Sequence, residues 1–189
     1  IMSDYGLDKS EQEAIEQIEG IKQLEYIYLK DVTVENSDVS FRVFSKPKNI
    51  SLYELVEGKF PENDDEIAID NKYREDYKIG ENIIFSEKLG ENEENTLKRH
   101  KFKIVGYINS SEIILRDNRG QTTVGTGELN SFGIVNETVF DSKVYMMAKV
   151  KFDDTNGVDP YSEQYNNLIQ NHKTELEEIL QKQQDTRLA

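Results

Sequence analysis

The spacing of the hydrophobic residues changes along the chain, and this change limits the folds that it can adopt. Near both ends, apolar side chains recur every three or four residues, which is typical of one face of a helix. Between the ends they alternate with polar residues in short runs, which is typical of strands. Because the longer helical patterns flank the strand patterns, the sequence predicts an α+β fold.

The first helical pattern follows Ser10. Ser10 and Glu13 have the spacing of a capping box, in which each side chain bonds a backbone N–H of the other residue. Ile15 and Ile18 then lie on one face, and Gly20 predicts the end of the helix. The chain therefore begins with a short amphipathic helix.

A long amphipathic helix is predicted from Ser162 to Leu188. The side chains of its apolar stripe recur at helical spacing. They are Tyr165, Leu168, Ile169, His172, Leu176, Ile179 and Leu180. We expect this stripe to be the buried face of the helix.

Short runs of β-branched and aromatic residues predict the strands. They cover residues 24–34, 39–43, 82–85, 102–106, 132–135 and 143–152. The first two form a predicted hairpin. Ser51 is expected to cap a short helical turn over 52–57, and Asp70 a second one up to Tyr77. Residues 86–100 predict a mobile hairpin loop, and residues 116–131 an exposed loop.

The composition argues against several classes of function. The chain has 37 acidic and 23 basic residues among 189, a net charge of −14. Nucleic acid is excluded as a partner because binding to phosphates requires clustered cations, and an anionic membrane surface is disfavoured for the same reason. The chain has no cysteine, which excludes disulfides, thiol catalysis and zinc–thiolate sites. Its ten tyrosines and eight phenylalanines indicate a folded core.

The residues that carry chemistry do not form a recognisable catalytic motif. His100 lies in the charged loop and His172 in the helix stripe, where a packing role is favoured over that of a base. No nucleophile-elbow serine is present. Gly125 and Gly127 lack the further glycine and the lysine of phosphate-binding loops. We therefore predict no catalytic residues, no cofactor and no resident metal.

One segment partly matches a calcium-binding loop. Asp154, Asn156, Gly157 and Glu163 occupy ligand or glycine positions of an EF-hand. Phe152 stands where the first ligand should be, so an ordinary turn before the final helix is favoured. Weak calcium binding between Asp154 and Glu163 remains an open alternative.

Four segments carry a resemblance to a known family. They are residues 56–61 (VEGKFP), 65–69 (DEIAI), 77–85 (YKIGENIIF) and 102–107 (FKIVGY). Together they resemble the extracytoplasmic domains of FtsX-like, MacB-type ABC transporter permeases. Residues 15–25 are similar to the opening of that domain, and residues 161–165 and 183–187 to its last segment in large Gram-positive members.

The resemblance implies a discontinuous layout and a function. Residues 1–45 and 132–189 would form a βαβ-containing lobe near the membrane, and residues 46–131 an inserted β-rich lobe. The domain would lie on the extracellular face of the plasma membrane of a Gram-positive-type cell and would not be an enzyme. The Ile1-Met2 start fits a loop taken from between two transmembrane helices.

The resemblance also implies partners. These are the protein's own transmembrane helices and a cognate cytoplasmic ATPase subunit, together with a peptide, a lipoprotein or a cell-surface protein. The domain would couple ATP hydrolysis to substrate handling or transmit movement, with the stripe of the final helix as the mechanical link. Arg116, Arg119 and Gln121 in the exposed loop are the candidate contact residues.

Three alternatives remain open. The same fold could be an extracellular sensor or binding module for cationic antimicrobial peptides, because a negative field steers cations towards it. A secreted enzyme would need a buried pair of titratable groups or a metal. An adhesion module would need repeats or an anchoring signal.

Overall fold

The computed structural model describes residues 1–50, 53–91, 93–112 and 119–188, and the chain forms two compact units. Unit 1 consists of Ile1–Tyr26 and Lys143–Ala189, and unit 2 of Ile27–Ser142. The chain therefore leaves unit 1 once and returns to it once. The crossings lie elsewhere than the expected 45/46 and 131/132 boundaries, because the strand that ends at Ser45 and the strand Ser131–Val135 both belong to the sheet of unit 2.

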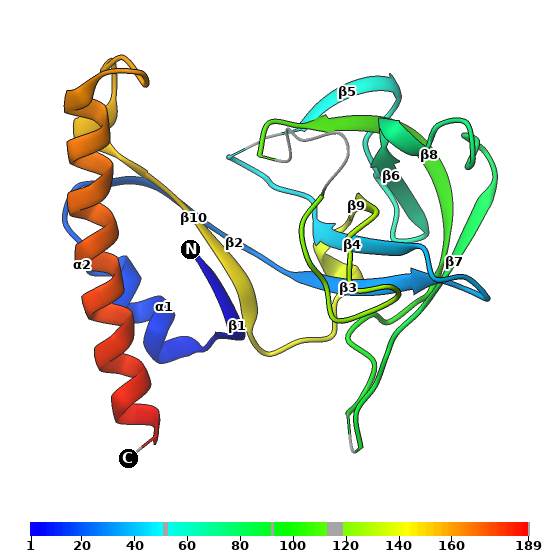
Figure 1. Ribbon diagram of the computed structural model, residues 1–189, viewed down its shortest axis with the longest axis horizontal. Helices are drawn as coiled ribbons and strands as arrows, with labels where there is room; N and C mark the ends of the chain where they lie inside the picture. The colour runs from blue at the N-terminus through cyan, green and yellow to red at the C-terminus, as the bar shows by residue number, and fades with distance from the viewer. Residues whose placement is uncertain (51–52, 92, 113–118, 189) are drawn as a thin grey trace. The chain divides into compact units, whose positions relative to one another are not determined.

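Unit 1 is a three-stranded sheet with two α-helices (Figure 1). The strand order is β1-β10-β2, and β1 runs antiparallel to β10. The elements are β1 (Met2–Leu7), α1 (Lys9–Glu16), β2 (Ile21–Ile27), β10 (Tyr145–Phe152), the 3₁₀ helix η3 (Asp153–Thr155) and α2 (Glu163–Leu188). β1, α1 and β2 follow one another along the chain. In the sheet, β10 lies between β1 and β2. The α+β class and the long C-terminal helix are as predicted.

Helix α1 begins two residues earlier than the sequence pattern predicts. The carboxylate of Asp8 accepts hydrogen bonds from the backbone N–H groups of Ser10 and Glu11, and the Glu11 carboxylate accepts one from the N–H of Asp8. The Ser10 hydroxyl donates to Asp8 instead of capping the helix. The capping box is therefore Asp8–Glu11, because the Asp8 carboxylate accepts from two N–H groups at once.

The core of unit 1 is small. Leu7, Ile15 and Ala148 are completely buried, and they join β1, α1 and β10. Half-buried apolar side chains surround them, namely those of Ile1, Ile21, Leu24, Tyr26 and Leu180. The apolar faces of both helices are thus directed at one cluster.

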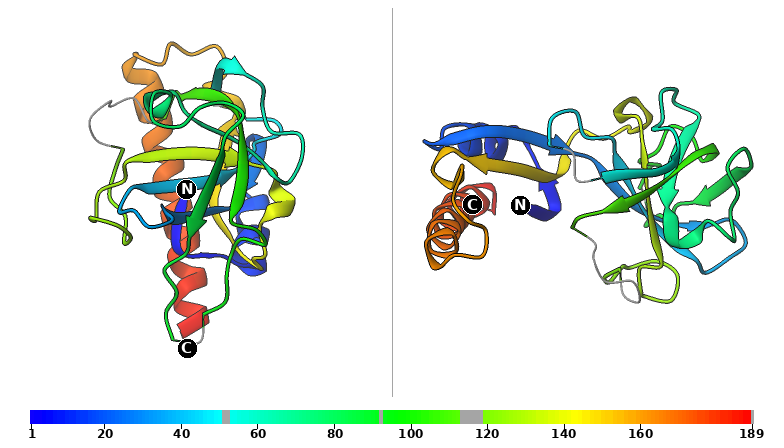
Figure 2. Two further views of the ribbon diagram at one scale, coloured as in Figure 1. Left: turned by 90° about the vertical axis from the view of Figure 1, so that its right-hand side faces the viewer. Right: turned by 90° about the horizontal axis from the view of Figure 1, so that it is seen from above.

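Unit 2 is a seven-stranded sheet that closes on itself (Figure 2). The strand order is β5-β8-β6-β9-β4-β3-β7, and β7 also pairs with β8. The elements are β3 (Leu29–Val34), β4 (Ser40–Ser45), β5 (Tyr53–Gly58), β6 (Glu66–Asp70), η1 (Asn71–Tyr73), β7 (Asn82–Ser86), β8 (Lys101–Ser110), β9 (Ser131–Val135) and η2 (Glu137–Val139). Strand β5 is added to the C-terminal end of β8, outside the closed ring.

Two predicted elements differ in the structure. The predicted strand over residues 24–34 is broken at Tyr28 into β2 and β3, and β3 forms the predicted hairpin with β4. The prediction of a helical turn over 52–57 is wrong for residues 53–57, because these residues form β5 and pair antiparallel with β8. Ser51 and Leu52 lie outside the described residues.

The interior of the closed sheet holds the main core. Its buried side chains come from β3, β4, β6, β7, β8, β9, η2 and the residues around them. They are Val32, Phe41, Val43, Ile67, Ile69, Ile83, Phe85, Leu97, Phe102, Ile104, Tyr107, Val135, Val139 and Phe140. Among the described residues, no helix combines the length and the apolar character needed to cross a membrane.

Candidate functional site

The predicted contact residue Arg119 lies against the end of β6. Its Nη2 donates to Oδ1 of Asp70 at 3.0 Å and lies 2.9 Å from Oδ2. The two side chains are 8% and 2% exposed, and the guanidinium also lies 5.6 Å from the centre of the Phe132 ring. Asp70 accepts a second bond from the backbone N–H of Lys72 and so caps η1. Arg119 is therefore part of a buried ion pair.

Burial decides the protonation behaviour of Asp70. It raises the pKa of the carboxyl above its ordinary value, while the N–H of Lys72 and the charge of Arg119 lower it. Without its two donors this carboxylate would be a poorly solvated charge. The pair therefore holds the end of the loop on the sheet.

The other two predicted contact residues have different outcomes. Gln121 is exposed, and its backbone oxygen accepts a hydrogen bond from Nη2 of Arg42 at 3.1 Å. Arg116 lies outside the described residues. The described part of the loop is only partly exposed, because Val124 and Leu129 are buried. The ion pair of Arg119 is a feature that the sequence analysis missed, since its partner lies 49 positions away.

The stripe of α2 is where the sequence predicts it. Every residue of the predicted stripe has intermediate exposure, whereas the residues between them are exposed. The half-buried residues are Tyr165, Leu168, Ile169, His172, Leu176, Ile179 and Leu180. The helix contacts α1 and η3 within unit 1. A role in mechanical coupling remains a prediction.

His172 makes a polar contact within this stripe. Its Nε2 lies 2.9 Å from both carboxylate oxygens of Asp154 in η3. Its ring stacks on Phe152, with 3.6 Å between the centroids and 4° between the planes. His172 is thus a packing residue with one polar partner, in line with the role that the sequence favours.

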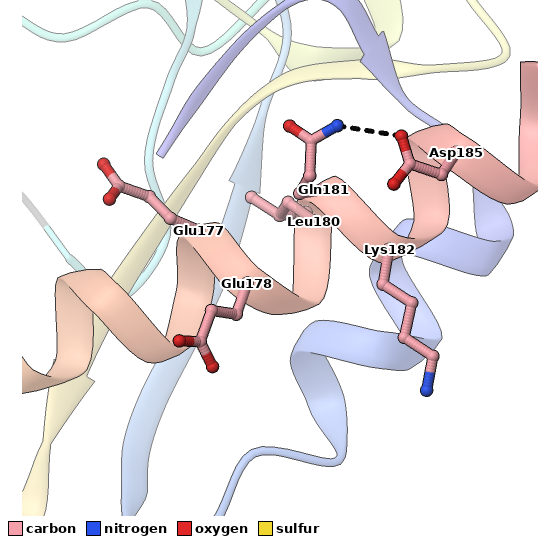
Figure 3. A pocket seen from close by; sticks show the side chains of 6 residues that line it. All are labelled: Glu177, Glu178, Leu180, Gln181, Lys182 and Asp185. Atoms are coloured by element: carbon pink, nitrogen blue, oxygen red, sulfur yellow. Dashed lines mark hydrogen bonds between the residues drawn. The ribbon is translucent and has the colours of Figure 1, made fainter.

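A shallow, open depression also lies on α2 (Figure 3). All of its lining side chains come from this one helix, and the Gln181 side chain donates to Asp185 within it. The lining residues are Glu177, Glu178, Leu180, Gln181, Lys182 and Asp185. No nucleophile is held against a base among them, so the depression has no catalytic arrangement.

The segment considered for calcium binding does not gather ligands. Among the described residues, no group of three or more His, Asp or Glu side chains is placed to hold a metal ion. Asp154 contacts His172 instead, and Glu163 is the first residue of α2. This arrangement is that of a turn between a strand and a helix.

The segments that resemble the permease family meet at one place in unit 2. Gly58 of β5 lies opposite Gly106 of β8, and the backbone N–H of Lys59 donates to the Val105 oxygen at 2.9 Å. The N–H of Gly80 donates to Ile104 at 2.8 Å. The segments around Gly58 and Gly80 therefore bind along one stretch of β8, which itself carries Gly106.

Glu66 organises the turn between β5 and β6. Its Oε2 accepts hydrogen bonds from the backbone N–H groups of Glu62 at 2.8 Å and Asn63 at 3.0 Å, and its Oε1 lies 3.0 Å from Nζ of Lys59. The Glu62 N–H is the largest cause that lowers the pKa of Glu66 from 4.5 to about 2, against the opposing effect of burial. The carboxylate is therefore needed in its charged form.

We expect Glu66→Gln to destabilise the chain by about 1.5–3 kcal/mol at pH 7, because hydrogen bonds to a charged group are replaced by weaker ones. The contribution of Glu66 is complete above pH 4.5 and is lost as the pH falls towards about 2, since the unfolded chain takes up the proton first. Denaturant unfolding at several pH values measures this. The two proteins should converge in acid, and a pH-independent difference would contradict the role of the charge.

The loop over residues 86–100 is anchored at its base. The Glu87 carboxylate is completely buried and accepts hydrogen bonds from the backbone N–H groups of Thr96 and Leu97. Nε2 of His100 lies 2.8 Å from the same carboxylate. The expected mobility concerns the remainder of this loop and stays a prediction.

Comparison with known proteins gives a structural similarity but no sequence match. No protein-family model matches the chain. No curated protein sequence matches it. The crystal structure of the extracellular domain of the noncanonic ABC-type transporter YknZ from Gram-positive bacteria is similar, with a TM-score of 0.45 and 13% sequence identity. The match covers 85% of this chain and 82% of that chain.

Proposed function

We propose that this chain is the extracytoplasmic domain of an FtsX/MacB-like ABC transporter permease. It is not an enzyme in this proposal. A separate cytoplasmic ATPase hydrolyses ATP, and the domain couples that hydrolysis to the handling of a substrate, peptide or lipoprotein outside a Gram-positive-type cell. Its partners are its own transmembrane helices and the ATPase subunit.

The observation that carries the proposal is that segments that resemble the family contact one another in the fold. Residues 56–61, 77–85 and 102–107 are separate in the sequence and together resemble the family. In the fold, Gly58, Gly80 and Gly106 all lie on β8 or bond to it. A chance resemblance would have no reason to place its segments in one local structure, so the contact supports a shared origin.

The course of the chain agrees with a domain carried between membrane segments. Both chain ends belong to unit 1, and unit 2 is inserted between them. In this proposal unit 1 is the membrane-proximal lobe and α2 leads to the membrane. ATP-driven association of the two cytoplasmic subunits then moves the domain as a rigid body or about a hinge. Gln121 and Arg116 are the proposed contact residues, and Arg119 holds the loop that bears them.

The gene that encodes the chain provides the first test. We expect one apolar helix of about 20 residues encoded before residue 1, and three or more after residue 189. Co-purification of the full-length membrane protein with an ATPase would then identify the complex. A signal peptide with no later membrane span would refute the proposal.

The charge favours one other function. A net charge of −14 attracts cations over distances beyond direct contact. A module that captures cationic antimicrobial peptides would therefore bind basic peptides with an affinity that falls steeply with salt. Binding of this kind by a chain without membrane spans would favour the alternative over the permease.

A further inference from the structure

Helix α2 is long, but its polar attachment to the rest of unit 1 is narrow. It has 26 residues, about 39 Å at 1.5 Å per residue. Among its described residues, His172 is the one whose side chain makes a polar contact with another element. The ion pair of Lys173 with Glu177 and the bond from Gln181 to Asp185 remain within the helix.

The apolar contacts of α2 define its position along its axis only in part. Aliphatic residues recur at helical spacing along the stripe, from Leu168 and Ile169 to Ile179 and Leu180, and all are half-buried. Hydrophobic contacts are non-directional. A displacement by one turn, about 5.4 Å, would again place a leucine at some positions of the stripe, because Leu176 and Leu180 are four residues apart.

The site of His172 differs because it accepts only one residue of the stripe. The carboxylate of Asp154 accepts a hydrogen bond from His172, and Phe152 provides a flat surface for a ring. A one-turn displacement would place Leu168 or Leu176 opposite Asp154, and neither side chain can donate a hydrogen bond. Asp154 would then exchange this hydrogen bond for water and Phe152 would lose its stacked ring, so the displaced position is less stable.

The residues that hold His172 are themselves fixed. Phe152 is the last residue of β10 and is 6% exposed. The hydroxyl of Thr155 donates to the Phe152 oxygen at 2.8 Å, and the N–H of Asp153 donates to the Gly20 oxygen at 2.8 Å. Helix η3 is thereby bonded both to the end of β10 and to the connection between α1 and β2.

We propose that His172 and Asp154 set the register of α2 on unit 1, with Phe152 as the support for the histidine ring. His172 is a positioning residue in the sense that a single polar side chain fixes register in an otherwise apolar helix interface. If the proposed function holds, this contact determines how a displacement of α2 reaches the sheet. The register itself can be tested without any transport activity, so failure of one idea leaves the other standing.

The decisive variant is His172→Phe. It keeps an aromatic ring to stack on Phe152 and removes the donor to Asp154. Asp154→Ala removes the acceptor and leaves the histidine ring in place. The side chain of Asp154 is 46% exposed, so its removal leaves little buried space empty. Lys173→Ala is the matched control, because Lys173 is exposed and its ion pair is with Glu177 of the same helix.

The position of α2 can be measured directly because the chain has no cysteine. Glu13→Cys on α1 and Glu175→Cys on α2 introduce the two thiols for spin labels, and both positions are exposed. Electron–electron distance measurements should give one narrow distribution for the otherwise unchanged chain and for Lys173→Ala. We expect His172→Phe and Asp154→Ala to give a broadened distribution or a second distance, and α2 amides that exchange at least tenfold faster.

The outcomes separate cleanly. Unchanged distances and exchange rates in both variants would overturn the proposal. A change in His172→Phe but not in Asp154→Ala would also overturn it, since the polar contact would then not be the cause. If His172→Phe does not fold, as judged by circular dichroism, the Asp154→Ala result decides alone.

Discussion

Replacing Gly58 by alanine is expected to destabilise unit 2 by about 3 kcal/mol, a loss of roughly 6–12 °C in its melting temperature. Two independent effects act at this position. Gly58 has φ +79°, where a side chain costs about 1–2 kcal/mol. A Cβ there would also lie 2.2 Å from the Val105 carbonyl oxygen, so the backbone of β8 would have to move.

Two other glycines separate these effects. Gly106 has no positive φ, but its Cβ would lie 2.3 Å from the Lys59 oxygen, so Gly106→Ala tests the close approach alone. Gly80 has φ +95° with nothing within 4 Å, so Gly80→Ala tests the conformation alone and should cost about 1 kcal/mol. All three lie in unit 2, which makes them a matched set.

Thermal and denaturant unfolding, followed by circular dichroism, give the comparison. The expected order of destabilisation is Gly58→Ala above Gly106→Ala above Gly80→Ala. Equal and small effects at all three positions would mean that β5 and β8 are not in close contact. The family resemblance of these glycines would then have no structural explanation.

These glycines also show what the sequence could and could not predict. Their positions in the sequence indicate turns and are part of the family resemblance. The sequence alone does not indicate that Gly58 and Gly106 face one another. Local sequence patterns predict the structure correctly where residues that are close in the chain pair with each other. The β3–β4 hairpin follows from the alternation of Val39, Phe41 and Val43 next to a tight turn, and it is present.

Prediction failed where the partner is distant. The serine cap expected at Ser51 favoured a helical turn, yet residues 53–58 pair with β8 some fifty positions later, and tertiary pairing outweighed the local preference. Strand β1 was not predicted, because its pairing with β10 joins opposite ends of the chain. The chain crosses between the units elsewhere than predicted for the same reason, since β9 pairs with β6 and β3 with β7, and both β6 and β7 lie in the predicted inserted lobe.

The same distinction between local and distant partners applies to the candidate functional residues. The stripe of α2 is a local property, because its period lies within the helix, and the sequence located it. The environment of Arg119 is non-local, because its partner Asp70 belongs to β6. A charged residue in a polar loop is usually exposed, and the sequence contained no signal that Arg119 is an exception.

Arg119→Ala is therefore expected to lower the stability of unit 2 by about 3–5 kcal/mol, which is the cost of leaving one member of a buried ion pair without its partner. Most of this loss arises from Asp70, which keeps the N–H of Lys72 but loses its cation. Adding Asp70→Asn to the variant should restore part of the loss. The asparagine still caps η1 but brings no charge into the interior.

The pH dependence identifies the cause. Burial already raises the pKa of Asp70, and without Arg119 the pKa rises further. Because the folded chain then keeps this proton at a pH where the unfolded chain has released it, stability falls as the pH rises above the ordinary carboxyl range. Arg119→Ala should therefore be closest to the unchanged protein in mild acid and weakest near pH 7. The double variant should lack this dependence.

Gln121→Ala supplies the contrast. Its exposed side chain can be removed at a cost within about 0.5 kcal/mol, because the bond from Arg42 goes to the backbone oxygen. A transport or binding defect in Gln121→Ala would then report on a contact, whereas the same defect in Arg119→Ala would report first on the fold. If Arg119→Ala proved as stable as the unchanged protein at every pH, its side chain would face solvent. The original hypothesis of an exposed contact residue would then hold for Arg119 as well.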